Sequence, residues 1–152
     1  MTRVLLATDA DWISDEVTAA LADADTELYR VRKGSDVVVA CQELAPDLAV
    51  IDMQIGNMGG MATCLAIRHE EEMGRLDPMA ILLLADRAQD AFLARRAEAD
   101  GVLVKPIDAF RLRRAASTVL EGDAYTDGLD WFTEQESDGA STGNADPVAT
   151  DA

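Results

Sequence analysis

Three residues with chemically useful side chains, Asp9, Asp52 and Lys105, each stand at the end of a short apolar run. Carboxylates can act as nucleophiles and hold hard cations, and a lysine supplies a fixed positive charge. Short apolar runs bounded by turn signals are typical of buried strands. Parallel sheets bind ligands beyond the carboxyl ends of their strands. We therefore expect these three side chains to meet at one edge of a sheet.

The elements that must position them alternate five times along the chain. The expected strands cover 4–7, 26–32, 48–51, 79–84 and 102–104, and the expected helices cover 14–24, 36–44, 61–73, 89–99 and 109–120. Ser14 and Asp108 are the expected N-caps of the first and last helices. Such alternation predicts an α/β fold with a doubly wound parallel sheet. For five strands the common order is 2-1-3-4-5, the flavodoxin-like order, with the more polar strand 26–32 at an edge.

Length and composition divide the chain into a domain and a tail. Its 152 residues suit one domain, 1–121, followed by an acidic segment, 122–152. Asp, Glu, Ser, Thr, Gly and Ala dominate that segment, so we expect it to be mostly disordered. Trp131 and Phe132 are exceptions within it. They are predicted either to pack back on the domain or to form a docking motif for a partner.

The charge of the chain narrows its possible partners. There are 29 acidic and 13 basic residues, a formal net charge of −16. This balance argues against binding to nucleic acid, whose phosphates are recognised by Lys and Arg, and we expect no DNA-binding output domain. No signal peptide or apolar membrane span is visible, so we expect a cytoplasmic protein. Cys41 and Cys64 are expected to be small core residues.

Several motifs together resemble the receiver domain of bacterial two-component response regulators. The resemblance covers about residues 3–120 and rests on four segments: 4–9, 46–52, the glycine turn at 59–60, and 101–106. It implies the five-stranded receiver fold and a role in phosphorelay signal transduction. A sensor histidine kinase or another signalling protein is the implied partner.

The resemblance also implies a chemistry and a set of roles. Asp52 is the implied phosphoryl acceptor, and Lys105 is the implied contact to the phosphate. Asp9, Asp52 and the backbone carbonyl of Gln54 are the implied ligands of Mg²⁺. Pro106 is expected to follow a cis peptide bond, as is common in the family. No enzymatic activity is expected beyond self-phosphorylation from a phosphodonor and slow self-dephosphorylation.

Three positions that depart from the usual receiver pattern are Thr8, Ala85 and Val102. Thr8 stands where receivers carry the first of two adjacent acids, so the Mg²⁺ site is predicted to be weakened. Asp11 is a candidate substitute acid, with a helix cap or surface charge as its alternative role. Ala85 lacks the hydroxyl, and Val102 lacks the aromatic ring, that receivers use to transmit phosphorylation. We therefore expect an atypical receiver without the ordinary switch.

Three functions remain open. The first is a stand-alone receiver whose output runs through protein contacts or a homodimer on its helix 4–strand 5–helix 5 face. Five arginines are predicted to lie on that face, where they either bind an acidic partner or are simply solvated: Arg95, Arg96, Arg111, Arg113 and Arg114. The second is a pseudo-receiver that acts without phosphorylation. The third is a haloacid-dehalogenase-like phosphatase with Asp9 as nucleophile and Asp11 as acid.

Overall fold

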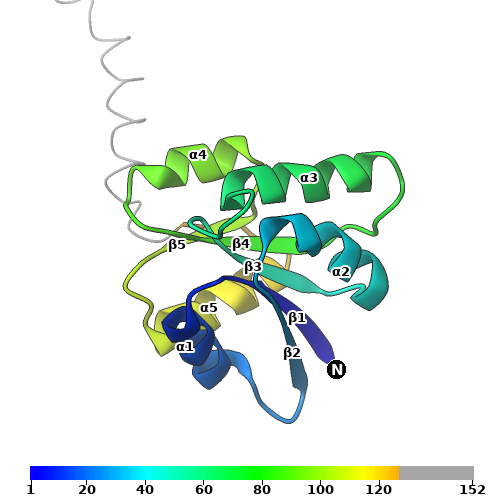
Figure 1. Cartoon of the computed structure of the whole chain (residues 1–152). Helices are drawn as coiled ribbons and strands as arrows, with labels where there is room; N and C mark the ends of the chain where they lie inside the picture. Colours follow the sequence, from blue (N-terminus) through cyan, green and yellow to red (C-terminus); the bar gives the residue numbers. More distant parts are fainter. Residues whose placement is uncertain (127–152) are drawn as a thin grey trace, which may run out of the picture.

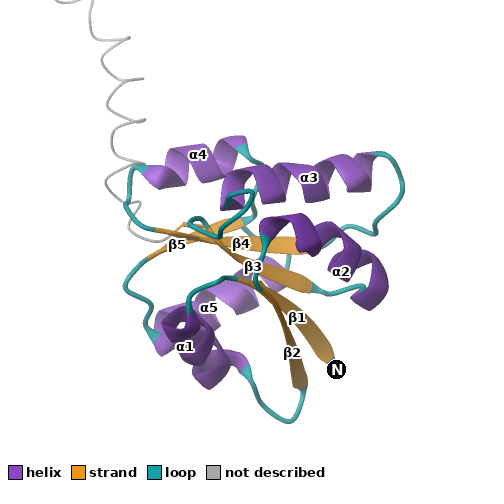
Figure 2. Ribbon diagram, in the orientation of Figure 1, coloured by secondary structure: helices purple, strands orange, loops and turns teal. Residues whose placement is uncertain are grey.

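The structure is a computed structural model that describes residues 1–126. It contains a parallel sheet between two layers of helices (Figure 1). Helices α2, α3 and α4 cover one face, and α1 and α5 cover the other (Figure 2). The predicted doubly wound α/β fold is therefore confirmed. Within the described residues no helix is long and apolar enough to cross a membrane.

The sheet has the order β2-β1-β3-β4-β5-β6, which contains the predicted 2-1-3-4-5 order and adds one strand. The strands are β1 (Thr2–Ala7), β2 (Thr26–Val31), β3 (Leu48–Asp52), β4 (Ala80–Ala85), β5 (Gly101–Val104) and β6 (Tyr125–Thr126). The helices are α1 (Asp11–Leu21), α2 (Val37–Leu44), α3 (Gly60–Glu72), α4 (Asp90–Arg96) and α5 (Ala109–Leu120), and a 3-10 turn, η1 (Gly34–Asp36), precedes α2. The strand predicted at an edge, β2, lies there.

The additional strand β6 falls in the segment that the sequence assigned to the tail. Tyr125 pairs with Gly101 and Thr126 with Val102, in parallel. The Tyr125 amide donates to the carbonyl of Asp100 at 3.1 Å. In the described part of the chain, β6 and not β5 therefore forms the outer edge of the sheet.

Alternation along the central strands divides the core between the two faces. All five residues of β3 are buried, as expected for a strand covered by helices on both sides. Ala49 and Ile51 pack toward α2, α3 and α4, whereas Leu48 and Val50 pack toward α1 and α5. Such two-sided burial holds the end of β3, and so Asp52, in a fixed position.

The predicted glycine turn brings α3 directly onto the end of β3. Gly59 has φ +82°, a left-handed conformation that favours glycine. A Cβ on Gly60 would lie 2.8 Å from the carbonyl oxygen of Asp52 and 2.6 Å from Cα of Met53. Only glycine allows this close approach, and α3 begins there, one residue earlier than predicted.

The predicted N-cap at Ser14 is wrong. Helix α1 begins at Asp11, and the Ser14 amide already donates to the carbonyl of Ala10 at 3.2 Å. The Thr8 hydroxyl accepts a hydrogen bond from the Ala10 amide at 3.1 Å, which turns the chain earlier. In contrast, Asp108 caps α5 as predicted, because its side chain accepts from the Phe110 amide.

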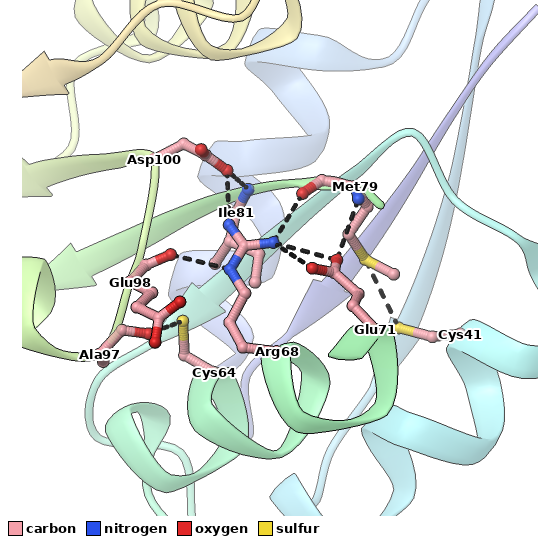
Figure 3. Close-up of polar contacts among 9 residues, drawn as sticks. All are labelled: Cys41, Cys64, Arg68, Glu71, Met79, Ile81, Ala97, Glu98 and Asp100. Carbon is pink, nitrogen blue, oxygen red and sulfur yellow. Dashed lines mark hydrogen bonds and ion pairs between the residues drawn. The ribbon is translucent and has the colours of Figure 1, made fainter. Parts of the chain in front are cut away.

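A partly buried charged cluster around Arg68 fastens α3 to the amino ends of β4 and β5 (Figure 3). The Arg68 guanidinium donates to Asp100 at 2.7 Å, to Glu71 at 2.9 Å, and to the carbonyls of Glu98 at 2.8 Å and Met79 at 3.0 Å. Each carboxylate also accepts a backbone amide of the sheet or of the loop before it. The guanidinium and both carboxylates thus all have hydrogen-bond partners, which indicates a structural role for the cluster.

The two cysteines lie beside this cluster and belong to the core, as predicted (Figure 3). Burial raises the pKa of Cys41 and the pKa of Cys64 to about 12 in each case. Thiolate is the reactive form of cysteine, so both side chains are inert near neutral pH.

Candidate functional site

Asp52 lies at the carboxyl end of β3 with only 1% of its surface exposed. Its Oδ1 accepts from the Lys105 ammonium at 2.7 Å and from the Gln54 amide at 3.0 Å. Its Oδ2 accepts from the Thr8 hydroxyl at 2.8 Å. A buried carboxylate needs such partners, and both of its oxygens have them.

Sheet register explains why residues distant in sequence meet here. Ala7 pairs with Ile51 across β1 and β3, so Thr8 and Asp52, each one residue further, are neighbours. Ala85 pairs with Val104, which makes neighbours of Asp86 and Lys105 in the same way. The predicted meeting of side chains at one sheet edge is found for Asp52 and Lys105. The peptide bond between Lys105 and Pro106 is cis, as the resemblance implied.

Lys105 joins two carboxylates. Its Nζ lies 2.7 Å from Asp52 and 3.0 Å from Asp86, and 11% of its side chain is exposed. Burial alone lowers the pKa of this ammonium, but the hydrogen bonds and charges of Asp52 and Asp86 outweigh it and raise the pKa above its ordinary value. Lys105 is therefore a fixed positive charge at neutral pH.

Asp86 is a residue of this site that the sequence reasoning missed. Its Oδ1 accepts from Lys105, and its Oδ2 accepts from the Gln54 side-chain amide at 2.6 Å. Burial raises the pKa of the Asp86 carboxyl, but the hydrogen bonds of Lys105 and Gln54 and nearby positive charges produce a net lowering. A signal was available, because Asp86 comes two residues after one expected strand and Lys105 comes one residue after the adjacent one.

Asp9 lies on the exposed side of the same edge. Its Oδ2 accepts from the Gly56 amide at 3.0 Å. A Cβ on Gly56 would stand 2.7 Å from that oxygen, so glycine leaves room for the carboxylate. The described residues contain no cluster of three or more His, Cys, Asp or Glu side chains able to hold a metal ion. Mg²⁺ needs less, since one or two carboxylates with water and phosphate oxygens suffice. Asp9 and Asp52 stay its predicted ligands.

Asp11, the candidate substitute acid, is engaged elsewhere. Its Oδ1 lies 3.0 Å from the Arg30 guanidinium and 3.3 Å from that of Arg32, and 76% of the side chain is exposed. The hydrogen bond from Arg30 and the charges of both arginines lower the pKa of Asp11. Asp11, the first residue of α1, thus forms surface ion pairs with arginines at the end of β2. Its lowered pKa makes it a poor proton donor.

The positions that depart from the usual receiver pattern are buried. Ala85 is fully buried at the end of β4, and Val102 is buried in β5. Neither side chain carries a polar atom, so neither can form a hydrogen bond to a group on Asp52.

The five arginines predicted to lie on the helix 4–strand 5–helix 5 face do not all lie there. The Arg96 guanidinium lies 5.7 Å from the ring centre of Phe92 on α4, and Arg111 donates to the carbonyl of Val104 at the end of β5. Arg113 instead donates to the carbonyl of Ala20 in α1. Successive helical residues point about 100° apart, which places Arg113 on the α1 side of α5 and outside the predicted face.

Comparison with known families decides the classification. The family model described as "Response regulator receiver domain" matches residues 4–117, three quarters of the chain. The chain belongs to this family. Among its relatives, the receiver is 28% identical over 108 residues to the DNA-binding dual master transcriptional regulator RpaA of Synechocystis. It is 25% identical over 104 residues to the DNA-binding response regulator MtrA of Mycolicibacterium smegmatis.

These matches cover 71% and 68% of this chain but only 44% of either regulator, so the receiver spans less than half of their length. Solved structures show the same fold. The chemotaxis protein CheY4 of Vibrio cholerae matches with a TM-score of 0.69 and 23% identity, covering 78% of this chain and 98% of that one. A putative response regulator from Chloroflexus aurantiacus matches with a TM-score of 0.71 and 20% identity, covering 79% and 98%.

Proposed function

We propose that this receiver accepts a phosphoryl group on Asp52 and transmits the signal through protein contacts. The observation that carries the proposal is the buried Asp52 carboxylate held 2.7 Å from a fixed Lys105 ammonium at the carboxyl ends of the strands. A carboxylate oxygen attacks the phosphorus of a phosphodonor, an acyl phosphate bond forms, and the bond to the donor breaks with its electrons leaving on the donor.

Positive charge is needed because an anion approaches an anion. Lys105 supplies one fixed charge to the phosphoryl oxygens. Mg²⁺ would be held by Asp9, Asp52 and the carbonyl of Gln54, a set of oxygen donors that suits this cation. When bound, it neutralises charge on the phosphoryl oxygens. Thr8 hydrogen-bonds Asp52 without adding negative charge.

Partners and output are part of the proposal. A sensor histidine kinase or another signalling protein supplies the phosphoryl group, and the face formed by α4, β5 and α5 contacts the target or a second copy. The printed names of RpaA and MtrA describe DNA-binding proteins. DNA binding is not carried over to this chain, because its acidic balance disfavours contact with phosphates.

Intact-mass measurement tests the phosphorylation step. Incubation with acetyl phosphate and Mg²⁺ should add one phosphoryl mass to the wild-type chain. Asp52→Asn should abolish the adduct, Lys105→Met should strongly reduce it, and Asp77→Asn, which changes an exposed loop acid, should not affect it. Absence of any adduct in the wild type, or its survival in Asp52→Asn, would contradict the assignment.

A phosphorylation-independent pseudo-receiver is the second candidate. It is favoured by the complete set of hydrogen bonds on Asp52 and by the apolar side chains of Ala85 and Val102. Failure of beryllofluoride with Mg²⁺ to bind at millimolar concentration would support it. Turnover of a phosphate ester that survives Asp52→Ala but not Asp9→Ala would instead support the phosphatase alternative, which the ion pairs of Asp11 disfavour.

A further inference from the structure

Four residues form a closed ring of hydrogen bonds at the site: Asp52, Lys105, Asp86 and Gln54. Lys105 donates to Oδ1 of Asp52 at 2.7 Å and to Oδ1 of Asp86 at 3.0 Å. The Gln54 side chain donates to Oδ2 of Asp86 at 2.6 Å, and the Gln54 amide donates to Oδ1 of Asp52 at 3.0 Å. The ring thus links the ends of β3, β4 and β5.

The ring restricts what can reach the acceptor. Asp52 is almost fully buried, whereas 35% of the Asp86 side chain is exposed. Asp86 and Gln54 are therefore the parts of the ring that face solvent. A phosphoryl group on Asp52 needs the Lys105 ammonium as its counter-charge. One N–H of that ammonium already donates to Asp86. A carboxylate at this point also repels an incoming phosphate.

We propose that Asp86 is a latch, an internal carboxylate that competes with the phosphoryl group for Lys105 and is held closed by Gln54. The inference rests on the proposed function of Asp52. Phosphorylation then requires Asp86 to leave Lys105 and its bond to Gln54 to open. A hydrogen bond between charged groups has a net worth that corresponds to about 10- to 100-fold in rate. The latch sets how readily the site is phosphorylated.

The test compares full-length variants. Asp86→Ala removes the competing carboxylate, Asp86→Asn keeps its shape but not its charge, and Gln54→Ala opens the ring from the other side while retaining the Gln54 backbone. Asp77→Ala is the matched control. Two quantities are measured: the rate of adduct formation from acetyl phosphate, and the affinity for beryllofluoride with Mg²⁺ read by Trp12 fluorescence.

Asp86→Ala should speed adduct formation by about 10- to 100-fold and tighten beryllofluoride binding by a similar factor. Asp86→Asn and Gln54→Ala should give smaller gains, and Asp77→Ala none. Damage to the fold would slow the reaction, so a gain distinguishes a latch from a structural role.

Other outcomes overturn the latch and separate it from the proposed function. Equal or slower rates in Asp86→Ala than in the wild type would overturn the latch but leave Asp52 as the acceptor. No adduct and no beryllofluoride binding in any variant, Asp86→Ala included, would overturn both proposals.

Discussion

The Thr8 hydroxyl donates to Oδ2 of Asp52 across 2.8 Å, at a position where receivers usually carry an acid. Thr8 is fully buried, and the same hydroxyl accepts the Ala10 amide. A neutral donor therefore satisfies the Asp52 carboxylate from the side of β1. This arrangement stabilises the site without a metal, and it removes one carboxylate from the pair that would attract Mg²⁺.

Thr8→Val should destabilise the protein by about 1–3 kcal/mol, because a buried carboxylate oxygen loses its hydrogen bond while the shape of the side chain is kept. Urea unfolding at neutral pH measures this change. Thr18→Val, an exposed position on α1, is the control and should cost a few tenths of that amount. Equal costs at both sites would contradict the importance of the Thr8 hydrogen bond.

Thr8→Asp should make stability depend on Mg²⁺. Two adjacent carboxylates at a buried site repel each other, so the melting temperature should fall in EDTA and recover as Mg²⁺ is added. We expect the affinity for Mg²⁺ to rise by about tenfold or more, since a second carboxylate joins the ligand set. Titration followed by Trp12 fluorescence checks this result. Thr18→Asp adds the same charge on an exposed part of α1 and should show neither effect.

Arg68→Met should destabilise the fold by about 1–3 kcal/mol, since Glu71 and Asp100 would keep their charges in a partly buried site and lose their hydrogen bonds to the guanidinium. Denaturant unfolding measures the loss. Arg75→Met breaks a more exposed ion pair with Glu70 and should cost no more than about 1 kcal/mol. Similar costs for the two arginines would show that the Arg68 cluster is not a structural anchor.

Stability should fall as pH rises above 9. The folded-state pKa values of Cys41 and Cys64 are raised from 9.0 to about 12, so unfolding releases protons across this range. Their stabilising contribution is fully present below pH 9 and is lost as pH rises toward 12, by up to about 1.4 kcal/mol per pH unit for each thiol. Urea unfolding between pH 8 and 11 measures the slope. The Cys41→Ala/Cys64→Ala double variant should have a flatter slope, and an unchanged slope would contradict the assignment.

Truncation after Gly122 should expose the edge of β5 and promote self-association. Loss of β6 leaves the unpaired backbone groups of β5 free to pair with another chain. Sedimentation velocity should therefore detect larger species than for a chain truncated after Thr126, which keeps β6 and serves as the control. Identical behaviour of both truncations would contradict a protective role for this strand.

Much of the fold could be predicted from the sequence, because the inner strands β3 and β4 are apolar on both faces and glycine, proline or aspartate marks the ends of several strands. Asp52 and Lys105 could be placed together for the same reason. Strand β6 could not be predicted, since two residues are too short for any periodic pattern and pairing with β5 alone defines them.

The start of α1 was missed because the Ala10 amide donates to the Thr8 hydroxyl, a bond that no local pattern reveals, and this turns the chain before Ser14. Asp86 was missed for a different reason. Its position was expected, but the reach of its side chain to Lys105 and Gln54 depends on tertiary geometry. The domain boundary at residue 121 and the roles of the site residues stay predictions.

Strand β6 runs parallel to β5, so its carboxyl end, Thr126, lies on the side of the sheet edge that carries Asp52 and Lys105. A reporter group attached at Thr126 would therefore be anchored on the outer strand of the sheet, near the edge that carries the proposed acceptor. A fluorescent label there would leave the side chains around Asp52 unaltered, and its signal would test whether a change at that residue reaches the edge of the sheet.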